Sequence, residues 1–123
     1  MIKEECKKII DTIYEQCSQI NWNNQNASGI TKFSYDKICE IINKFDDKYL
    51  KDVIIGATSD GDFTLEWKNK YKENFYIVIL TDESINNVTF AYTFYSYSEK
   101  YNGIVEYKNK IPEKIIDCLD KII

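Results

Sequence analysis

The sequence predicts an α+β fold with two N-terminal helices, an antiparallel meander of about five strands, and a C-terminal helix packed on one face of the sheet. Three observations lead to this prediction. Apolar residues recur every three or four positions in the first fifty residues and again near the end, as in amphipathic helices. Between residues 53 and 107 the apolar period changes to two, and short turn segments separate the runs, as in strands. The length of 123 residues suits one domain, residues 1–123.

The helices are placed by their apolar stripes and end signals. The first is expected over residues 2–20, before an Asn-rich segment that carries Trp22. The second is expected to begin with Ser34 as its N-cap and to continue as far as Tyr49. Pro112 suits the first turn of the closing helix. The apolar stripe of that helix consists of Ile115, Ile116, Leu119 and Ile122.

The first hairpin has two competing registers around Asp60-Gly61. A two-residue loop would divide the apolar side chains between both faces of the sheet. A three-residue loop, residues 59–61 with a left-handed Gly61, keeps them on one face. Its pairs are Ala57 with Phe63, Ile55 with Leu65, and Val53 with Trp67. Because register follows the buried face, we expect the three-residue loop.

Three more strands complete the predicted meander. Residues 75–80 are apolar on both faces, which is typical of a central strand. Residues 88–97 alternate and form a long strand. Asn102-Gly103 is a strong turn signal, so a short last strand is expected over residues 104–107.

Composition excludes several kinds of chemistry. All 16 basic side chains are lysines, and the chain has neither Arg nor His. Bidentate arginine contacts and imidazole acid–base catalysis are therefore absent. The four cysteines have no C-x-x-C spacing, so we expect reduced core thiols, a cytoplasmic location, and no metal or other cofactor. No apolar run approaches the ~18 residues that span a bilayer, so no membrane association is expected.

One enzymatic alternative rests on three charged residues. Asp62, Glu66 and Lys68 fall on one face of the second strand, opposite the apolar residues. Metal-dependent nucleases use an Asp followed by Glu-x-Lys on a strand, where the carboxylates bind Mg²⁺ and the lysine positions water. This face is also the ordinary solvent side of an amphipathic strand. The nuclease is therefore kept as the alternative.

A cluster of aromatic residues is the predicted binding surface. Its members are Tyr95, Tyr97, Tyr101 and Tyr107, with Trp22 as a further candidate. Tyrosine combines a large rigid contact area with a hydroxyl group that tolerates water, which suits protein interfaces. Neighbouring lysines also fit single-stranded nucleic acid, but the net charge of −4 opposes direct nucleic-acid binding. Burial within the fold is the other explanation of the same tyrosines.

The segment from Asp60 to Trp67 matches a known pattern. It resembles the motif Asp-Gly-x-apolar-x-Leu-Glu-Trp of a loose group of small uncharacterised proteins from bacteria and their mobile elements. The resemblance implies a leading helix, a Trp-containing loop and a second helix before the motif, and a hydrophobic strand after it. It implies no activity and no catalytic residues.

These observations together favour a non-enzymatic protein-binding module. The expected role is that of an inhibitor, such as an immunity protein, an antitoxin, or a phage- or mobile-element-encoded blocker of a defence nuclease or toxin. The partner is another protein, and an acidic chain suits one with a basic nucleic-acid groove. A self-associating structural subunit, such as a homodimer, is the remaining alternative.

Overall fold

The computed structural model describes residues 1–20, 22–23 and 27–123. It confirms the α+β class with two N-terminal helices, a five-stranded antiparallel sheet and a C-terminal helix. The elements in chain order are α1 (Ile2–Cys17), α2 (Lys32–Lys44), α3 (Asp47–Leu50), β1 (Ile54–Ala57), β2 (Phe63–Lys68), β3 (Asn74–Asp82), the 3-10 helix η1 (Glu83–Ile85), β4 (Asn87–Tyr95), β5 (Lys100–Glu106) and α4 (Glu113–Ile122).

The strands follow one another across the sheet in the order β1-β2-β3-β4-β5, so β3 is central as predicted. The register of the first hairpin is also as predicted: Ala57 lies opposite Phe63 and Ile55 opposite Leu65. Gly61 has φ of 86°, and its N–H donates to the Thr58 carbonyl at 3.1 Å. The three-residue loop therefore forms because it keeps the apolar side chains on one face.

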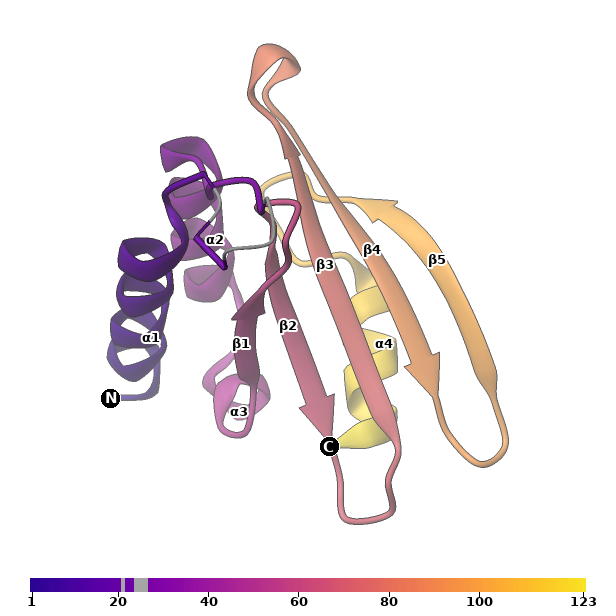
Figure 1. Ribbon diagram of the computed structural model, residues 1–123. Helices are drawn as coiled ribbons and strands as arrows, with labels where there is room; N and C mark the ends of the chain where they lie inside the picture. Colours follow the sequence, from indigo (N-terminus) through magenta and orange to yellow (C-terminus); the bar gives the residue numbers. More distant parts are fainter. Residues whose placement is uncertain (21, 24–26) are drawn as a thin grey trace.

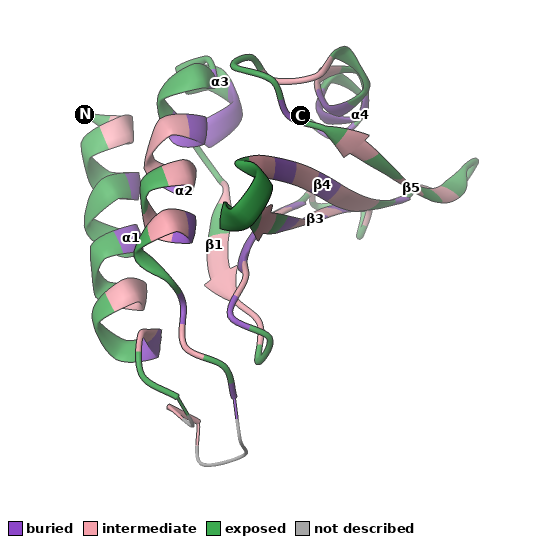
Figure 2. Ribbon diagram, turned by 90° about the horizontal axis from the view of Figure 1, so that it is seen from above, coloured by how far each residue is buried: buried purple, intermediate pink, exposed green. Residues whose placement is uncertain are grey.

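The core lies between that face and the helices. Figure 1 shows α4 behind the sheet, with α1 and α2 beside β1. Figure 2, seen from above, shows buried residues on the inward sides of these helices. The sheet contributes to the core the fully buried residues Phe63, Leu65, Trp67, Phe75, Ile77, Ile79, Phe90 and Phe94. Alternation along each strand therefore divides the sheet into a buried core face and an opposite face.

The helix boundaries differ from those predicted. The first helix ends at Cys17 rather than at residue 20. The N-cap of α2 is Thr31, whose side chain accepts from the Ser34 N–H at 3.1 Å. Ser34 is buried in the first turn, with its hydroxyl 2.6 Å from that of Thr81 on β3. The second helix stops at Lys44, since Phe45 is extended. Tyr49 belongs to the separate helix α3.

The predicted turn at Asn102-Gly103 is wrong. Both residues lie inside β5, and the turn between β4 and β5 comes earlier, where the Ser96 N–H donates to the Glu99 carbonyl at 2.8 Å. Gly103 is opposite Tyr92 on β4. A Cβ atom on Gly103 would lie 2.5 Å from the Tyr92 hydroxyl oxygen. The glycine therefore makes room for a cross-strand tyrosine and does not form a turn.

Two further expectations can be compared with the structure. The closing helix begins at Glu113 with Pro112 as its N-cap, one residue outside the predicted first turn. Its buried stripe is Ile115, Cys118, Leu119 and Ile122. Within the described ranges, no helix is long and apolar enough to cross a membrane.

Candidate functional site

The sheet face turned away from the core is the main surface that the described helices leave uncovered. We call it the open face. It carries the residues that alternate with the core positions, and α4 lies on the other side of the sheet (Figure 1). The cross-strand register places Gly56, Thr64, Val78, Ala91 and Ile104 in one row across it. The next row consists of Ile54, Glu66, Tyr76, Thr93 and Asn102.

The open face is more apolar than a solvated sheet face requires. Ile54 is 49% exposed, Leu80 38%, Tyr95 40% and Ile104 73%. Val78 lies half-buried between them. Antiparallel sheets with one solvated face usually alternate apolar residues inward with polar residues outward. Ile54 and Ile104 lie on the two edge strands and Leu80 and Tyr95 on strands between them, so exposed apolar side chains extend across the width of the face. Contiguous exposed apolar surface is typical of binding sites.

Carboxylates gather at one end of the open face. Asp62 precedes β2, Asp82 ends β3, and Glu106 ends β5, so the antiparallel register brings all three to the same end. Asp60, Asp62, Asp82 and Glu83 also line a groove of about 380 Å³ there. Burial and, to a smaller extent, the nearby negative charge of Asp60 raise the pKa of Asp62. Negative charge is therefore concentrated where the side chains remain partly accessible.

The predicted tyrosine cluster is divided between the two faces. Tyr95 is on the open face, and Tyr97, in the following turn, is 72% exposed. Tyr101 and Tyr107 point the other way: the ring of Tyr101 stacks on Phe94 at 5.0 Å between centroids. Only Tyr95 and Tyr97 are thus available to a partner as large exposed rings. The four residues do not form one surface.

Tyr107 is part of the core. It is 6% exposed and its hydroxyl donates to Glu40 at 2.6 Å. Burial and, to a smaller extent, that hydrogen bond raise the pKa of Tyr107. Trp22 is half-buried, and its Nε1–H donates to the Ser28 carbonyl at 3.0 Å. Both residues therefore have a structural role in fixing neighbouring segments.

The residues of the nuclease alternative lie on the open face but do not converge. Asp62 and Glu66 are four positions apart on an extended strand, roughly 13 Å between Cα atoms, with Thr64 between them. Glu66 accepts a hydrogen bond from Asn74 Nδ2 at 2.6 Å, and Lys68 Nζ lies 3.9 Å from its other oxygen. Mg²⁺ needs ligand oxygens at about 2.1 Å. This arrangement favours a strand-surface polar network over a shared metal site.

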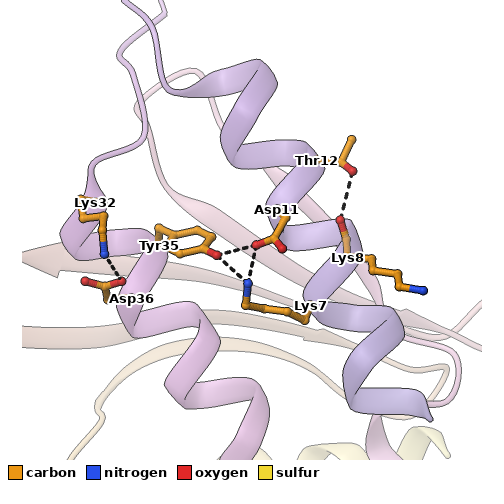
Figure 3. Close-up of polar contacts among 7 residues, drawn as sticks. All are labelled: Lys7, Lys8, Asp11, Thr12, Lys32, Tyr35 and Asp36. Carbon is orange, nitrogen blue, oxygen red and sulfur yellow. Dashed lines mark hydrogen bonds and ion pairs between the residues drawn. The ribbon is translucent and has the colours of Figure 1, made fainter.

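The closest cluster of ionisable groups joins α1 to α2 (Figure 3). Lys7 Nζ lies 2.6 Å from Asp11 Oδ1 and 2.6 Å from the Tyr35 hydroxyl, which donates to the same Asp11 oxygen at 2.5 Å. The hydrogen bond to Asp11 raises the pKa of Tyr35, and Asp11 likewise raises the pKa of Lys7. At neutral pH both groups stay protonated, so neither acts as a general base. The cluster connects two helices, and the ring of Tyr14 stacks on Tyr35 at 4.6 Å.

Burial disfavours the reactive thiolate form at three of the four cysteines. Cys6 and Cys17 are buried, Cys39 is half-buried, and burial raises the pKa of all three. All four cysteines are free. In the part of the chain that the structure describes, no three His, Cys, Asp or Glu side chains are grouped to bind a metal ion.

Sequence reasoning missed the apolar character of the open face, although a signal was present. Ile54, Val78, Leu80 and Ile104 occupy strand positions that alternate with the core residues. Once the register is known, these outward positions can be seen to carry more apolar residues than a solvated strand face usually does. For Ile104 this was prevented by the misplaced turn at Asn102-Gly103.

Comparison with known proteins gives no relative: no family model, no curated protein and no solved structure matches the chain.

Proposed function

We propose that this protein is a non-enzymatic binding module of the cytoplasm that docks another protein on the open face of its sheet, as an inhibitor of the immunity, antitoxin or anti-defence kind. One observation carries the proposal: apolar side chains lie exposed on the open face, between 38% for Leu80 and 73% for Ile104. When a partner removes such a surface from water, the free energy of the system falls, which favours binding.

The composition of the open face suits a protein partner. Protein interfaces have an apolar, aromatic centre and a polar rim. Here Val78 and Ala91 lie at the centre of the face, Leu80 and Tyr95 add apolar side chains toward its two ends, and the polar residues Asp82 and Lys100 lie at those ends.

The distribution of charge supports a basic partner. Three carboxylates, Asp62, Asp82 and Glu106, share one end of the face, and the chain has a net charge of −4. Opposite charge across an interface speeds association and excludes partners of the same sign. A nuclease or toxin with a lysine- and arginine-rich substrate groove has the required complement.

A matched pair of substitutions tests this proposal. Ile54→Lys places a cation on the open face opposite Glu66, where it can pair without opposing a like charge across the sheet. Ile9→Lys makes the same change on α1 at 45% exposure, against 49% for Ile54. In affinity capture from the cells that naturally contain the protein, wild type and Ile9→Lys should retain a stoichiometric, basic partner. Ile54→Lys should lose it.

The opposite pattern would reject the proposal. Retention by Ile54→Lys together with loss from Ile9→Lys would assign binding to the helical side. Binding that survives both substitutions equally would show that the open face is not the docking surface.

A further inference from the structure

The outer edge of β5 is the second surface that the fold leaves unpaired. β5 ends the sheet, and among the described residues no strand lies beyond it (Figure 1). An edge strand presents a row of free N–H and C=O groups, which form a template for another strand. Proteins usually block such edges with proline, a bulge or repelling charges. β5, with the sequence KYNGIVE, has no proline, and its two charges are of opposite sign.

The backbone groups that point outward can be identified. The Tyr107 N–H donates to the Val88 carbonyl at 2.9 Å, and the Glu99 carbonyl accepts from Ser96 at 2.8 Å. Odd-numbered residues of β5 therefore direct their backbone groups toward β4. Because these directions alternate along an antiparallel strand, the even-numbered residues direct theirs away from the sheet. The free edge consists of the N–H and C=O groups of Lys100, Asn102, Ile104 and Glu106.

We propose that β5 pairs antiparallel with β5 of a second copy of this chain, about a two-fold axis at Gly103. This inference is independent of the proposed function, because it uses the outer edge of the sheet and not its open face. In this register Lys100 lies opposite Glu106 of the second copy, and Asn102 opposite Ile104. All four outward-pointing residues of each copy then face outward-pointing residues of the other, as a hydrogen-bonded ladder requires.

Side chains support the same register. Each of the two Lys100–Glu106 pairs brings opposite charges together across the strands, which stabilises a sheet. The present partner of Glu106 is Lys108 at 3.4 Å, an exposed contact that leaves the Glu106 side chain 52% accessible. On the core face, half-buried Tyr101 lies opposite Val105 of the second copy. Aromatic and β-branched side chains are a favourable cross-strand pair.

The glycine at the axis removes a steric obstacle. Gly103 meets Gly103 of the second copy in a narrow, non-hydrogen-bonded pair, where Cα atoms approach to about 4.5 Å. Ile104, 73% exposed in the isolated chain, becomes a diagonal neighbour of Ile104 in the second copy. The dimer therefore covers the most exposed apolar residue of the strand.

Neighbouring registers are less favourable. An axis at Ile104 would place Lys100 opposite Lys108, two like charges, and Glu106 opposite Asn102. An axis at Asn102 would place Lys100 opposite Ile104 and remove Glu106 from the paired strand. Only the axis at Gly103 aligns the full length of β5 and both charge pairs.

A charge-swap experiment tests the pairing and its register together. In Glu106→Lys, positions 100 and 106 are both lysine, and in Lys100→Glu both are glutamate, so each variant opposes like charges. By sedimentation equilibrium, wild type should associate to twice the 14.5 kDa mass of one chain. Each variant alone should associate about tenfold more weakly or worse. An equimolar mixture should recover association as a heterodimer, because both lysines of one variant then face the two glutamates of the other.

A backbone substitution gives an independent check. Asn102→Pro removes an outward N–H and leaves the ladder to β4 intact, whereas Asn102→Ala keeps that N–H. The proline variant should be monomeric, and the alanine variant should dimerise like wild type. Circular dichroism should show both variants to be folded, so that a loss of association can be assigned to the strand edge.

Three results would overturn the inference. One is a wild-type chain that stays monomeric into the hundred-micromolar range. Another is dimerisation that Asn102→Pro leaves unchanged, which would assign it to a different surface. The third is a mixture of the two charge variants that associates no better than either alone, which would reject this register.

Discussion

Trp67 allows a quantitative test of the core, because the chain offers a matched control. Trp67 is 2% exposed, and its Nε1–H donates to the Tyr49 carbonyl at 2.6 Å, which connects β2 to α3. Its ring lies between Phe45 at 6.0 Å and Phe75 at 5.8 Å. Trp22, which is half-buried, also donates from Nε1 to a backbone carbonyl, at 3.0 Å, but this hydrogen bond is exposed to solvent. Substituting each tryptophan with phenylalanine removes the same kind of bond from two different environments.

The expected cost at Trp67 follows from three contributions. A buried carbonyl that loses its donor costs about 1–3 kcal/mol. The two ring carbons that phenylalanine lacks contribute about 1.5 kcal/mol, at roughly 0.8 kcal/mol each. The space they leave adds about 1 kcal/mol. Trp67→Phe should therefore lower the free energy of unfolding by roughly 4 kcal/mol, a large part of a typical domain's stability.

Trp22→Phe should lower the free energy of unfolding by about 1 kcal/mol or less, since water can donate to the exposed Ser28 carbonyl in place of the indole N–H. The assay is urea denaturation followed by far-UV circular dichroism, which does not depend on tryptophan fluorescence. Equal losses in the two variants, or a larger loss for Trp22→Phe, would refute the structural role of the motif's tryptophan.

Three further predictions concern a turn, the alkaline limit of stability and the acidic end of the open face. Gly61→Ala should cost at least about 1–2 kcal/mol in urea denaturation, because Gly61 has φ of 86° and a Cβ atom would lie 2.9 Å from the Gly29 carbonyl oxygen. Gly56→Ala, whose Cβ meets only the movable Thr64 hydroxyl at 3.0 Å, should stay within about 0.5 kcal/mol of wild type. The Asp120 hydrogen bond raises the pKa of Tyr49 to about 12, and burial raises the pKa of Tyr101 to about 12. Unfolded tyrosine titrates near pH 10, so the unfolded chain loses these protons first, and stability should fall as pH rises from about 10 to 12. Tyr49→Phe should make that fall less steep, and an unchanged profile would contradict the assignment. Burial raises the pKa of Asp62, so its ionised form destabilises the fold at neutral pH, and Asp62→Asn should raise the melting temperature at pH 7 while weakening partner binding. A lower melting temperature for Asp62→Asn would contradict this last prediction.

Much of the fold could be predicted because local pattern and burial agree. In the first hairpin, the buried face selects one of two registers, and Ala57 does lie opposite Phe63. The eight-residue motif is also explained by structure: Gly61 forms the turn, and Phe63, Leu65 and Trp67 enter the core. The turn glycine and the apolar residues of the motif therefore owe their identity to the fold.

The last hairpin could not be predicted in the same way, because a distant contact overrides the local signal. Asn102-Gly103 has the composition of a turn, but Gly103 is there because the Tyr92 ring lies against it. With the turn misplaced, the alternation of β5 could not be followed, so Tyr101 and Tyr107 were grouped with Tyr95 although they face the core. The same error concealed the exposed Ile104.

The proposed docking of a protein on the open face can be tested most directly by site-specific photo-cross-linking in the cells that naturally contain this chain. A benzophenone side chain at Leu80 would sit on the open face, and one at Thr12 on the exposed side of α1. A single stoichiometric adduct with another protein is expected from position 80 and none from position 12. An adduct from position 12 with none from position 80 would contradict the proposed docking.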